Sequence, residues 1–287
     1  MVATKSVAET HRYLCILYST NNNFMTCKDQ SLTFLNGFGY NVVRAPKVDI
    51  QPLQLLIREK GIMKNLGELA SLLNVGDLAP LPGIKRDKQM ANISGSRTSD
   101  LSAGVGISIL GNIIGAMGGS KLGLEAKYAQ AKTISFEFAD VLEDSLEIVM
   151  LDQFLAGADV NPLSRFVANL LEADDIFVIT AVIKSQSISV LSKKKNDTAV
   201  VVSVPEIKEI VGGNVDVSTK SGSESTITFS GKVPLVFGFQ AIQLTYEDGQ
   251  YKTFKHLKPG GGAVSFSAAA TAGSNGFHVF DQSFVQL

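Results

Sequence analysis

The sequence predicts an α+β fold with a twisted, largely antiparallel central sheet and surrounding helices. Segments that alternate apolar and polar residues occur in both halves of the chain, and they outnumber the segments with helical spacing. Of the 287 residues, 45% are hydrophobic, which is enough to bury a substantial core. We therefore expect one large domain or two small ones.

The first patterned elements lie after residue 24. Residues 1–24 lack periodicity, so we expect a non-functional N-terminal extension and a functional start at Met25. The run from Tyr40 to Ile57 is predicted to be extended, because it contains two prolines. Apolar residues from Ile62 to Leu73 recur every three or four positions, which predicts an amphipathic helix that ends at Gly76.

A loop over Leu78 to Gly83 and a solvated basic turn over Lys85 to Lys88 are expected next. The run from Leu101 to Ser120 then has twenty residues without a charge, about the length of a membrane-spanning helix. Six of them are Gly and four are Ser or Asn, so both helix formation and insertion are weakly favoured. We predict a segment kept flexible for rearrangement.

The second half of the chain is predicted to be mostly strand. Ile134 to Phe138 alternates with polar residues, as in a strand with one solvent-facing side. Asn161 and Pro162 are typical of a helix start, and the helix should bury a stripe that ends at Leu171. Two further strands, Ile176 to Leu191 and Thr198 to Val204, are expected to form a hairpin whose tip carries Lys193, Lys194 and Lys195.

Three more strands are predicted before the C-terminal section. They cover Asn214 to Thr219, Ser225 to Ser230 and Val233 to Tyr246, and Asp248-Gly249 marks a tight turn. His256 to Gly262 is rich in glycine and is predicted to be an exposed linker that a protease can cut.

The last 25 residues hold a single charge, so we expect this tail to dock on the rest of the protein. Large apolar side chains are its predicted anchors, namely Phe277, Val279, Phe280, Phe284, Val285 and Leu287.

Charge, cysteine content and motifs argue against several functions. A formal net charge of −1 and the lack of a basic arm indicate no nucleic-acid partner. Two cysteines, Cys15 and Cys27, suit a reducing cytoplasm, and the N-terminus lacks a secretion signal. No nucleophile elbow, zinc motif or P-loop occurs, so we predict no catalytic residues, no metal and no cofactor.

The alternating segments leave two interpretations open. Val182 to Ser192 and Thr198 to Lys208 are long enough for membrane-spanning barrel strands, and Leu101 to Lys121 with Leu122 to Phe138 could form a second hairpin. Lys193, Lys194 and Lys195 would then cross the bilayer or contact anionic headgroups. Each segment also fits an ordinary half-buried sheet in a water-soluble protein.

The order and spacing of several runs resemble the bacterial gasdermins over about residues 25–287. The runs are YNVVRAPKVDIQPLQLLI, the LAPLPG loop with the helix before it, the glycine-rich stretch within Ile93 to Val141, and VPLVFGFQAIQLTY. The resemblance implies a cytoplasmic monomer that a partner protease activates. It then forms a homo-oligomeric β-barrel pore among the phospholipids of the inner membrane and causes cell death in anti-phage defence.

The resemblance also implies specific roles for parts of this chain. Membrane strands would come from Leu101 to Val141 and Ile176 to Ser218, within a pore-forming domain of residues 25–257. Residues 258–287 would be the linker and autoinhibitory segment, with cleavage expected after Leu257, near Lys258, or within Gly260 to Ala263.

Cys27 matches the cysteine that carries a fatty acyl group, a palmitoyl chain, close to the start in this family. If residues 1–24 are translated, the thioester remains possible but its place at the terminus is lost. An unmodified, partly buried thiol is the alternative for Cys27, and a passive tether is the alternative for the linker. Two other functions stay open: a soluble sheet-based interaction module, and a hydrolase that uses Cys27 with His256 or His278.

Overall fold

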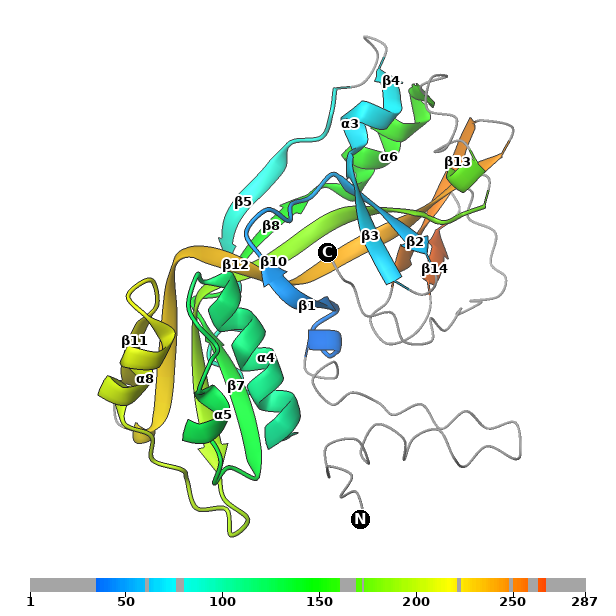
Figure 1. The fold of residues 1–287 in the computed structure, drawn as a ribbon. Helices are drawn as coiled ribbons and strands as arrows, with labels where there is room; N and C mark the ends of the chain where they lie inside the picture. The colour runs from blue at the N-terminus through cyan, green and yellow to red at the C-terminus, as the bar shows by residue number, and fades with distance from the viewer. Residues whose placement is uncertain are drawn as a thin grey trace, which may run out of the picture.

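The computed structural model describes residues 35–59, 62–75, 80–160, 169–171, 173–220, 223–247, 250–257 and 263–266. Two long strands, β10 (Ile176–Lys193) and β12 (Ser223–Glu247), run side by side through the whole molecule and connect two lobes (Figure 1). We call one lobe the body. It holds the Ile176 end of β10 and the Glu247 end of β12, together with β2 and β13. The other lobe, which holds α4 and β7, is the distal lobe.

The body is a sheet with the strand order β14-β13-β12-β10-β2-β3, and β1, β5 and β8 join it from the side. Two helices, α3 and α6, pack on it at one end (Figure 1). Its strands are β1 (Asn41–Lys47), β2 (Gln54–Glu59), β3 (Ile62–Glu68), β5 (Ile84–Gln89), β8 (Leu142–Leu146), β13 (Gln250–Leu257) and β14 (Ala263–Phe266). The helices are α3 (Leu69–Leu72) and α6 (Ile148–Ala156), followed by the small two-stranded sheet of β4 (Leu73–Val75) and β9 (Ala158–Val160).

The distal lobe continues the same sheet in the order β6-β7-β10-β12-β11 and covers one side of it with helices (Figure 1). Its elements are β6 (Leu101–Ser102), α4 (Ala103–Ala116), α5 (Leu124–Lys127), β7 (Thr133–Ala139), α8 (Val204–Val211) and β11 (Asp216–Lys220). Every recorded strand pairing in the described residues is antiparallel, which confirms the predicted α+β fold with an antiparallel sheet.

Three predictions for the N-terminal half are wrong. The predicted helix from Ile62 to Leu73 is strand β3 followed by the four-residue α3, because β2 pairs with β3. Gly67, with φ of 120°, leaves helical geometry there. Lys85 to Lys88 is exposed as expected but forms strand β5 rather than a turn. The run from Leu101 to Ser120 is mostly the packed helix α4, so the expectation of weak helix formation is wrong, whereas its rearrangement stays a prediction.

Corrections in the second half concern strand ends. Thr198 to Val204 makes a single bridge, Lys193 to Ala199, before helix α8 begins, so the predicted second strand of that hairpin is wrong. The runs Ser225 to Ser230 and Val233 to Tyr246 belong to one strand, β12. His256 and Leu257 belong to β13, so the linker does not begin at His256.

Two further predictions concern the residues around the gaps in the described chain. The helix predicted from Asn161 lies outside the described residues except for 169–171, which are helical. Asp248-Gly249 also lies outside them, but Glu247 pairs with Gln250 on either side, as a tight hairpin connection requires.

Candidate functional site

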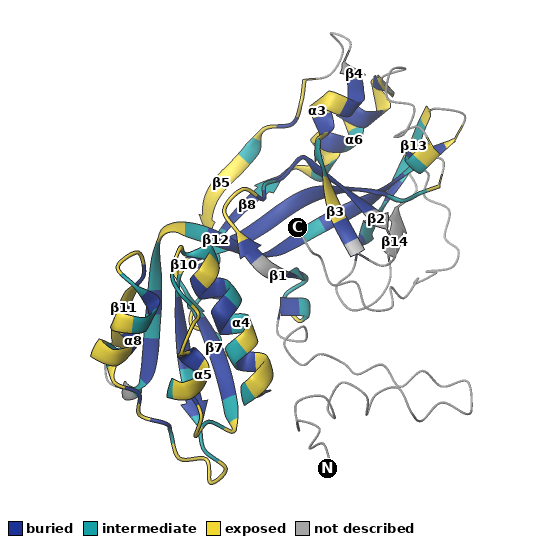
Figure 2. Cartoon of the chain, viewed as in Figure 1, coloured by how far each residue is buried: buried dark blue, intermediate teal, exposed yellow. Residues whose placement is uncertain are grey.

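The distal part of the sheet has one apolar and one polar side. On β7, β10 and β12 every second residue faces the helices, and these side chains form one buried cluster with α4, α5 and α8. Figure 2 shows that β7 and the neighbouring strands are largely buried where these helices lie over them. The strand members of this cluster are Leu101, Ile134, Phe136, Ile188, Val190, Val217, Ile227, Phe229 and Leu235, and all are at most 6% exposed. The alternation is what a strand needs when its two sides face different surroundings.

The opposite side of these strands carries mainly hydroxyl groups. Two pairs of hydroxyls meet across β10 and β12: Ser187 with Ser230 and Ser189 with Thr228, each with oxygens 2.8 Å apart. Glu137 of β7 is directly opposite Ser189, so a row of polar side chains crosses the strands. Ser135 and Glu137 are only 1% and 7% exposed, so the prediction that this side of β7 faces solvent is wrong.

Helix α4 shields the apolar side but is held by few of the interactions that stabilise a helix. Its N-cap, Ser102, makes no side-chain cap hydrogen bond, and neither its first turn nor its last turn carries a compensating charge. Four of its fourteen residues are Gly, and Gly106 packs so closely on β7 that an added Cβ would lie 2.6 Å from Cβ of Ile134. Packing on the sheet, rather than intrinsic preference, therefore keeps α4 in place.

Tyr128, just after α5, places a hydroxyl group inside the apolar cluster. The residue is 1% exposed, and its hydroxyl has no hydrogen-bond partner among the described residues. Burial raises the pKa of this phenol above its usual range. An unpaired buried hydroxyl destabilises the packed arrangement in which it sits.

A break in the strand pairing separates the distal lobe from the body. Ser185 of β10 pairs with Leu235 of β12, whereas Ser187 pairs with Ser230, so residues 231–234 bulge out of the ladder. At the same point β10 exchanges one neighbour for another, because Lys184 pairs with β8 and Ser187 pairs with β7. The two lobes therefore meet at a defined hinge.

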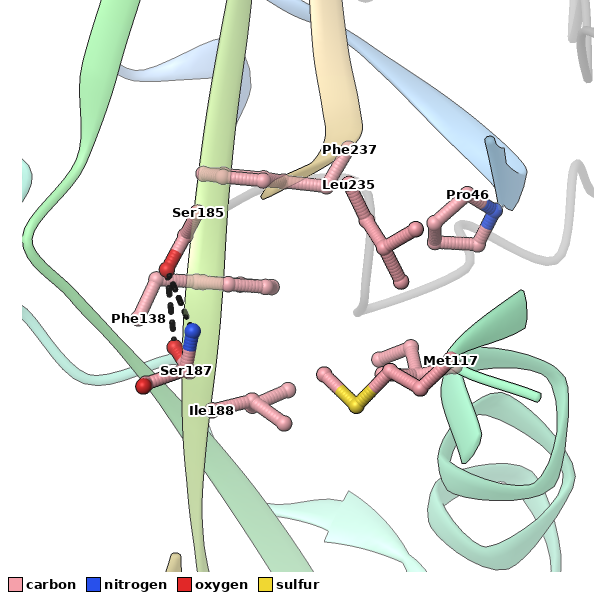
Figure 3. A pocket seen from close by; sticks show the side chains of 9 residues that line it. Pro46, Met117, Phe138, Ser185, Ser187, Ile188, Leu235 and Phe237 are labelled. Atoms are coloured by element: carbon pink, nitrogen blue, oxygen red, sulfur yellow. Dashed lines mark hydrogen bonds between the residues drawn. The ribbon is translucent and has the colours of Figure 1, made fainter. Parts of the chain in front are cut away.

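An apolar pocket at this hinge receives the end of α4 (Figure 3). Phe138 and Phe237 stack in it with ring centroids 3.9 Å apart and an interplanar angle of 2°, and Met117 points toward them from the helix end. The hydroxyl oxygen of Ser185 lies 2.5 Å from the Ala139 carbonyl and accepts from the Ser187 amide at 3.0 Å. The pocket leaves about 10 Å³, which is room for at most about one water molecule.

Ion pairs connect the elements of the distal lobe. Lys127 of α5 contacts Glu206 of α8, and Lys193 Nζ lies 3.0 Å from Asp100 Oδ2. Glu137, with a side chain 9% exposed, contacts both Arg97 and Lys220. Sequence reasoning missed the Glu137 pairs, because 83 residues separate Glu137 from Lys220.

The predicted hairpin tip lies at the far end of β10. Lys193 is the last residue of that strand, and the amide of Lys194 donates to the Thr198 carbonyl at 2.8 Å, which closes a turn. Lys194 is half-buried and Lys195 is exposed. The cationic turn is therefore present, although a helix and not a long strand follows it.

The other predicted residues lie mostly in the C-terminal section or near the start. Leu257 is in β13, pairs with Ala263 of β14 and is 6% exposed. Cys27, Lys258 and His278 lie outside the described residues, as do all the predicted anchors, Phe277, Val279, Phe280, Phe284, Val285 and Leu287. Their roles stay predictions.

The described residues offer little support for a metal site or a hydrolase. They contain no group of three or more His, Cys, Asp or Glu side chains placed to hold a metal ion. None of the helices described is both long enough and apolar enough to cross a bilayer. His256 is a partly buried strand residue, and burial lowers its pKa from 6.5.

Comparison with known proteins places the chain. A model of the Bacterial Gasdermin Family matches residues 43–250. The chain is 51% identical over 252 residues to "Gasdermin bGSDM" of a Desulfuromonadales bacterium, with 88% of this chain and 94% of the relative covered. It is 42% identical to "Gasdermin bGSDM" of Lysobacter enzymogenes over 82% of this chain and 87% of the relative.

A solved bacterial gasdermin from Bradyrhizobium tropiciagri shares the fold, with a TM-score of 0.58 at 20% identity over 78% of this chain and 90% of that one. The extent of the family match and the identity to the curated relatives confirm the resemblance inferred from the sequence. This chain belongs to the bacterial gasdermin family.

Proposed function

We propose that this protein forms membrane pores with the strands of its distal lobe. The single observation that carries the proposal is the two-sided distal sheet, whose apolar side is hidden by α4, α5 and α8. A membrane barrel needs strands with an apolar side for lipid and a polar side for water, and β7, β10 and β12 already have both. Moving the helices away would expose the apolar side.

The parts that would move lie within the segments that the resemblance assigns to membrane strands. Leu101 to Val141 and Ile176 to Ser218 contain β6, α4, α5, β7, all of β10 and α8, and only the distal end of β10 would move with the helices. The weak stabilisation of α4, which has four glycines and no cap hydrogen bond, supports a lobe that can rearrange. Oligomerisation of the rearranged lobes would close the barrel, since a closed barrel leaves no unpaired strand edge in lipid.

Activation is proposed to follow removal of the C-terminal segment by a protease. β14, the described part of residues 258–287, pairs with β13 along four residues from Phe254 to Leu257. Because Leu257 is buried and paired with Ala263, we place the cut after it, within residues 258–262, whose glycine-rich sequence is typical of a linker. After a cut, only non-covalent contacts would hold the C-terminal segment on the body. It would therefore dissociate when the protein concentration is low.

The biological role that we propose is that of a non-enzymatic effector. It would stay in the cytoplasm as a monomer, insert into the inner membrane after cleavage, and kill the cell during phage infection. A palmitoyl chain on Cys27 would add membrane affinity, although one acyl chain alone anchors only marginally. The intact mass of the purified protein tests this modification, and Cys27→Ala should remove the added mass.

Dye release from phospholipid vesicles tests the pore. The linker residues 258–262 are replaced by the recognition sequence of a specific protease, and a control protein carries the same sequence after Leu287 instead. Cutting the linker should release dye, whereas cutting the control should not. If the cut protein stays monomeric and the vesicles stay sealed, the soluble interaction module replaces the pore as the better explanation.

A further inference from the structure

The carboxylate of Glu137 connects two strands that are not neighbours. Lys220 of β11 contacts Oε1 of this carboxylate, and Arg97 Nη2 lies 3.4 Å from Oε2. Arg97 forms an isolated bridge directly opposite Glu137, so this pair spans one strand spacing. Lys220 reaches the same group from much farther across the sheet.

Two strands, β10 and β12, lie between β7 and β11 in the distal sheet. Three spacings of about 4.8 Å would put the backbones of Glu137 and Lys220 about 14 Å apart in a flat sheet. Side chains stand roughly perpendicular to a sheet, so they do not close such a gap along its surface. The contact therefore requires the distal sheet to curl toward its polar side.

We propose that the Glu137–Lys220 ion pair is a clamp that keeps the distal sheet curled in the inactive protein and must open before the pore forms. The proposal rests on the pore function proposed above. A barrel grows wider as its strand number rises, so each protomer's share of a large oligomeric barrel is nearly flat. Flattening separates β11 from β7 and breaks this pair, but it leaves the Arg97 pair and the hydroxyl pairs in place.

The polar side of the sheet makes the opening of the clamp feasible. Glu137 lies in the row with Ser189 and Thr228, on the side that would face water inside a barrel. A carboxylate released there becomes hydrated, so it does not remain as an uncompensated buried charge. The clamp can thus hold the inactive form without preventing the active one.

A reversible cross-link tests whether the two strands must separate. In a full-length background with Cys15→Ser, Cys27→Ser and the cleavable linker, Glu137→Cys and Lys220→Cys are joined by methylene bis(methanethiosulfonate). This reagent leaves one carbon between two reducible disulfides, so the bridge is much shorter than the separation that flattening would produce. The matched control joins Ser189→Cys to Thr228→Cys, which are direct neighbours on the same side of the sheet and stay so when it flattens. Dye release from phospholipid vesicles is measured after the linker cut, before and after reduction.

We expect the Glu137–Lys220 cross-link to abolish dye release and reduction to restore it, while the Ser189–Thr228 cross-link leaves release unchanged. Equal release from the cross-linked and reduced forms of the first protein would overturn the clamp and leave the pore intact. Loss of release in both cross-linked proteins would also overturn the clamp. A cross-link between direct neighbours would then inhibit release as much as the cross-link between Glu137 and Lys220 does. A complete lack of release from both reduced proteins would reject the pore function itself, and the clamp with it.

Discussion

The two ends of strand β10 differ in what surrounds them. From Ile176 to Ile183, in the body, eight consecutive residues are buried, so apolar side chains cover both sides of the sheet. From Ser187 to Lys193, in the distal lobe, Ile188 and Val190 face the helices, whereas Ser187 and Ser189 on the other side pair with hydroxyls of β12. The body therefore loses packing on both sides if it opens, whereas the distal lobe loses it on one side. The same strand therefore joins a part that is packed on both sides to the part that we propose rearranges.

The largest expected effect contrasts a core aromatic residue in each lobe. Phe177 in the body and Phe229 in the distal lobe are both 0% exposed, so Phe→Ala at either should cost about 3–5 kcal/mol locally. Segment-resolved hydrogen exchange should show lost protection in both lobes for Phe177→Ala, but only in the distal lobe for Phe229→Ala. Equal loss in both lobes for Phe229→Ala would mean that the lobes unfold as one unit.

A smaller effect is expected from a methyl group between α4 and β7. Gly106→Ala should destabilise the distal lobe by about 1–3 kcal/mol, because the new Cβ lies 2.6 Å from Ile134 Cβ. Gly104→Ala on the same helix is the matched control, since nothing lies within 4 Å of its Cβ and alanine favours helix. Hydrogen exchange of α4 should rise for the first variant and fall for the second; the same direction in both would contradict the packing argument.

Removing the unpaired hydroxyl should stabilise the distal lobe. Tyr128→Phe is expected to raise the free energy of unfolding by about 1 kcal/mol and to slow dye release after cleavage. Tyr251→Phe in the body is the control, because the Tyr251 hydroxyl donates to Asp152 Oδ1 at 2.7 Å and its loss should destabilise. Denaturant unfolding measures both changes, and a lower stability for Tyr128→Phe would argue against an unsatisfied group.

The smallest effect concerns acid and the edge of the body. Burial lowers the pKa of His256 from 6.5, so below this pH the unfolded chain binds a proton more readily than the folded one. Its contribution to stability is therefore present above pH 6.5 and is lost as the pH falls through the lowered pKa. His256→Gln should reduce the fall in thermal midpoint between pH 7 and 5.5, and an unchanged fall would assign the acid sensitivity to other groups.

Periodicity predicted much of the fold and the strands of the distal lobe. The alternation of Ile134, Phe136 and Phe138 with polar residues identified β7, and the long apolar run from Ile176 identified β10. The prediction of a helix from Ile62 to Leu73 is wrong. The apolar spacing of this run fits a helix, but its pairing with β2 favours a strand. A local pattern does not show which neighbouring strand has backbone groups free to pair. Pairing in the folded protein then determines whether the run forms a helix or a strand.

The site was predictable where it depends on binary patterning and not where it depends on distant contacts. The polar and apolar sides of β10 could be read from the chain, as could the cationic turn at Lys193 to Lys195. The stack of Phe138 on Phe237, and the contact of Glu137 with Lys220, join residues about 100 and 83 positions apart. No periodic pattern encodes such contacts, because they depend on how the sheet curls.

In the pore proposed above, the length of β12 would also determine how the protein is held in a bilayer. A barrel strand uses about 10 residues to cross the hydrocarbon core, and β12 has 25. Its C-terminal part can therefore stay embedded among β10, β1 and β13 while its N-terminal part extends into lipid. The inserted part of β12 would then stay joined to the body through its own backbone, so no separate contact would be needed to hold the body at the membrane.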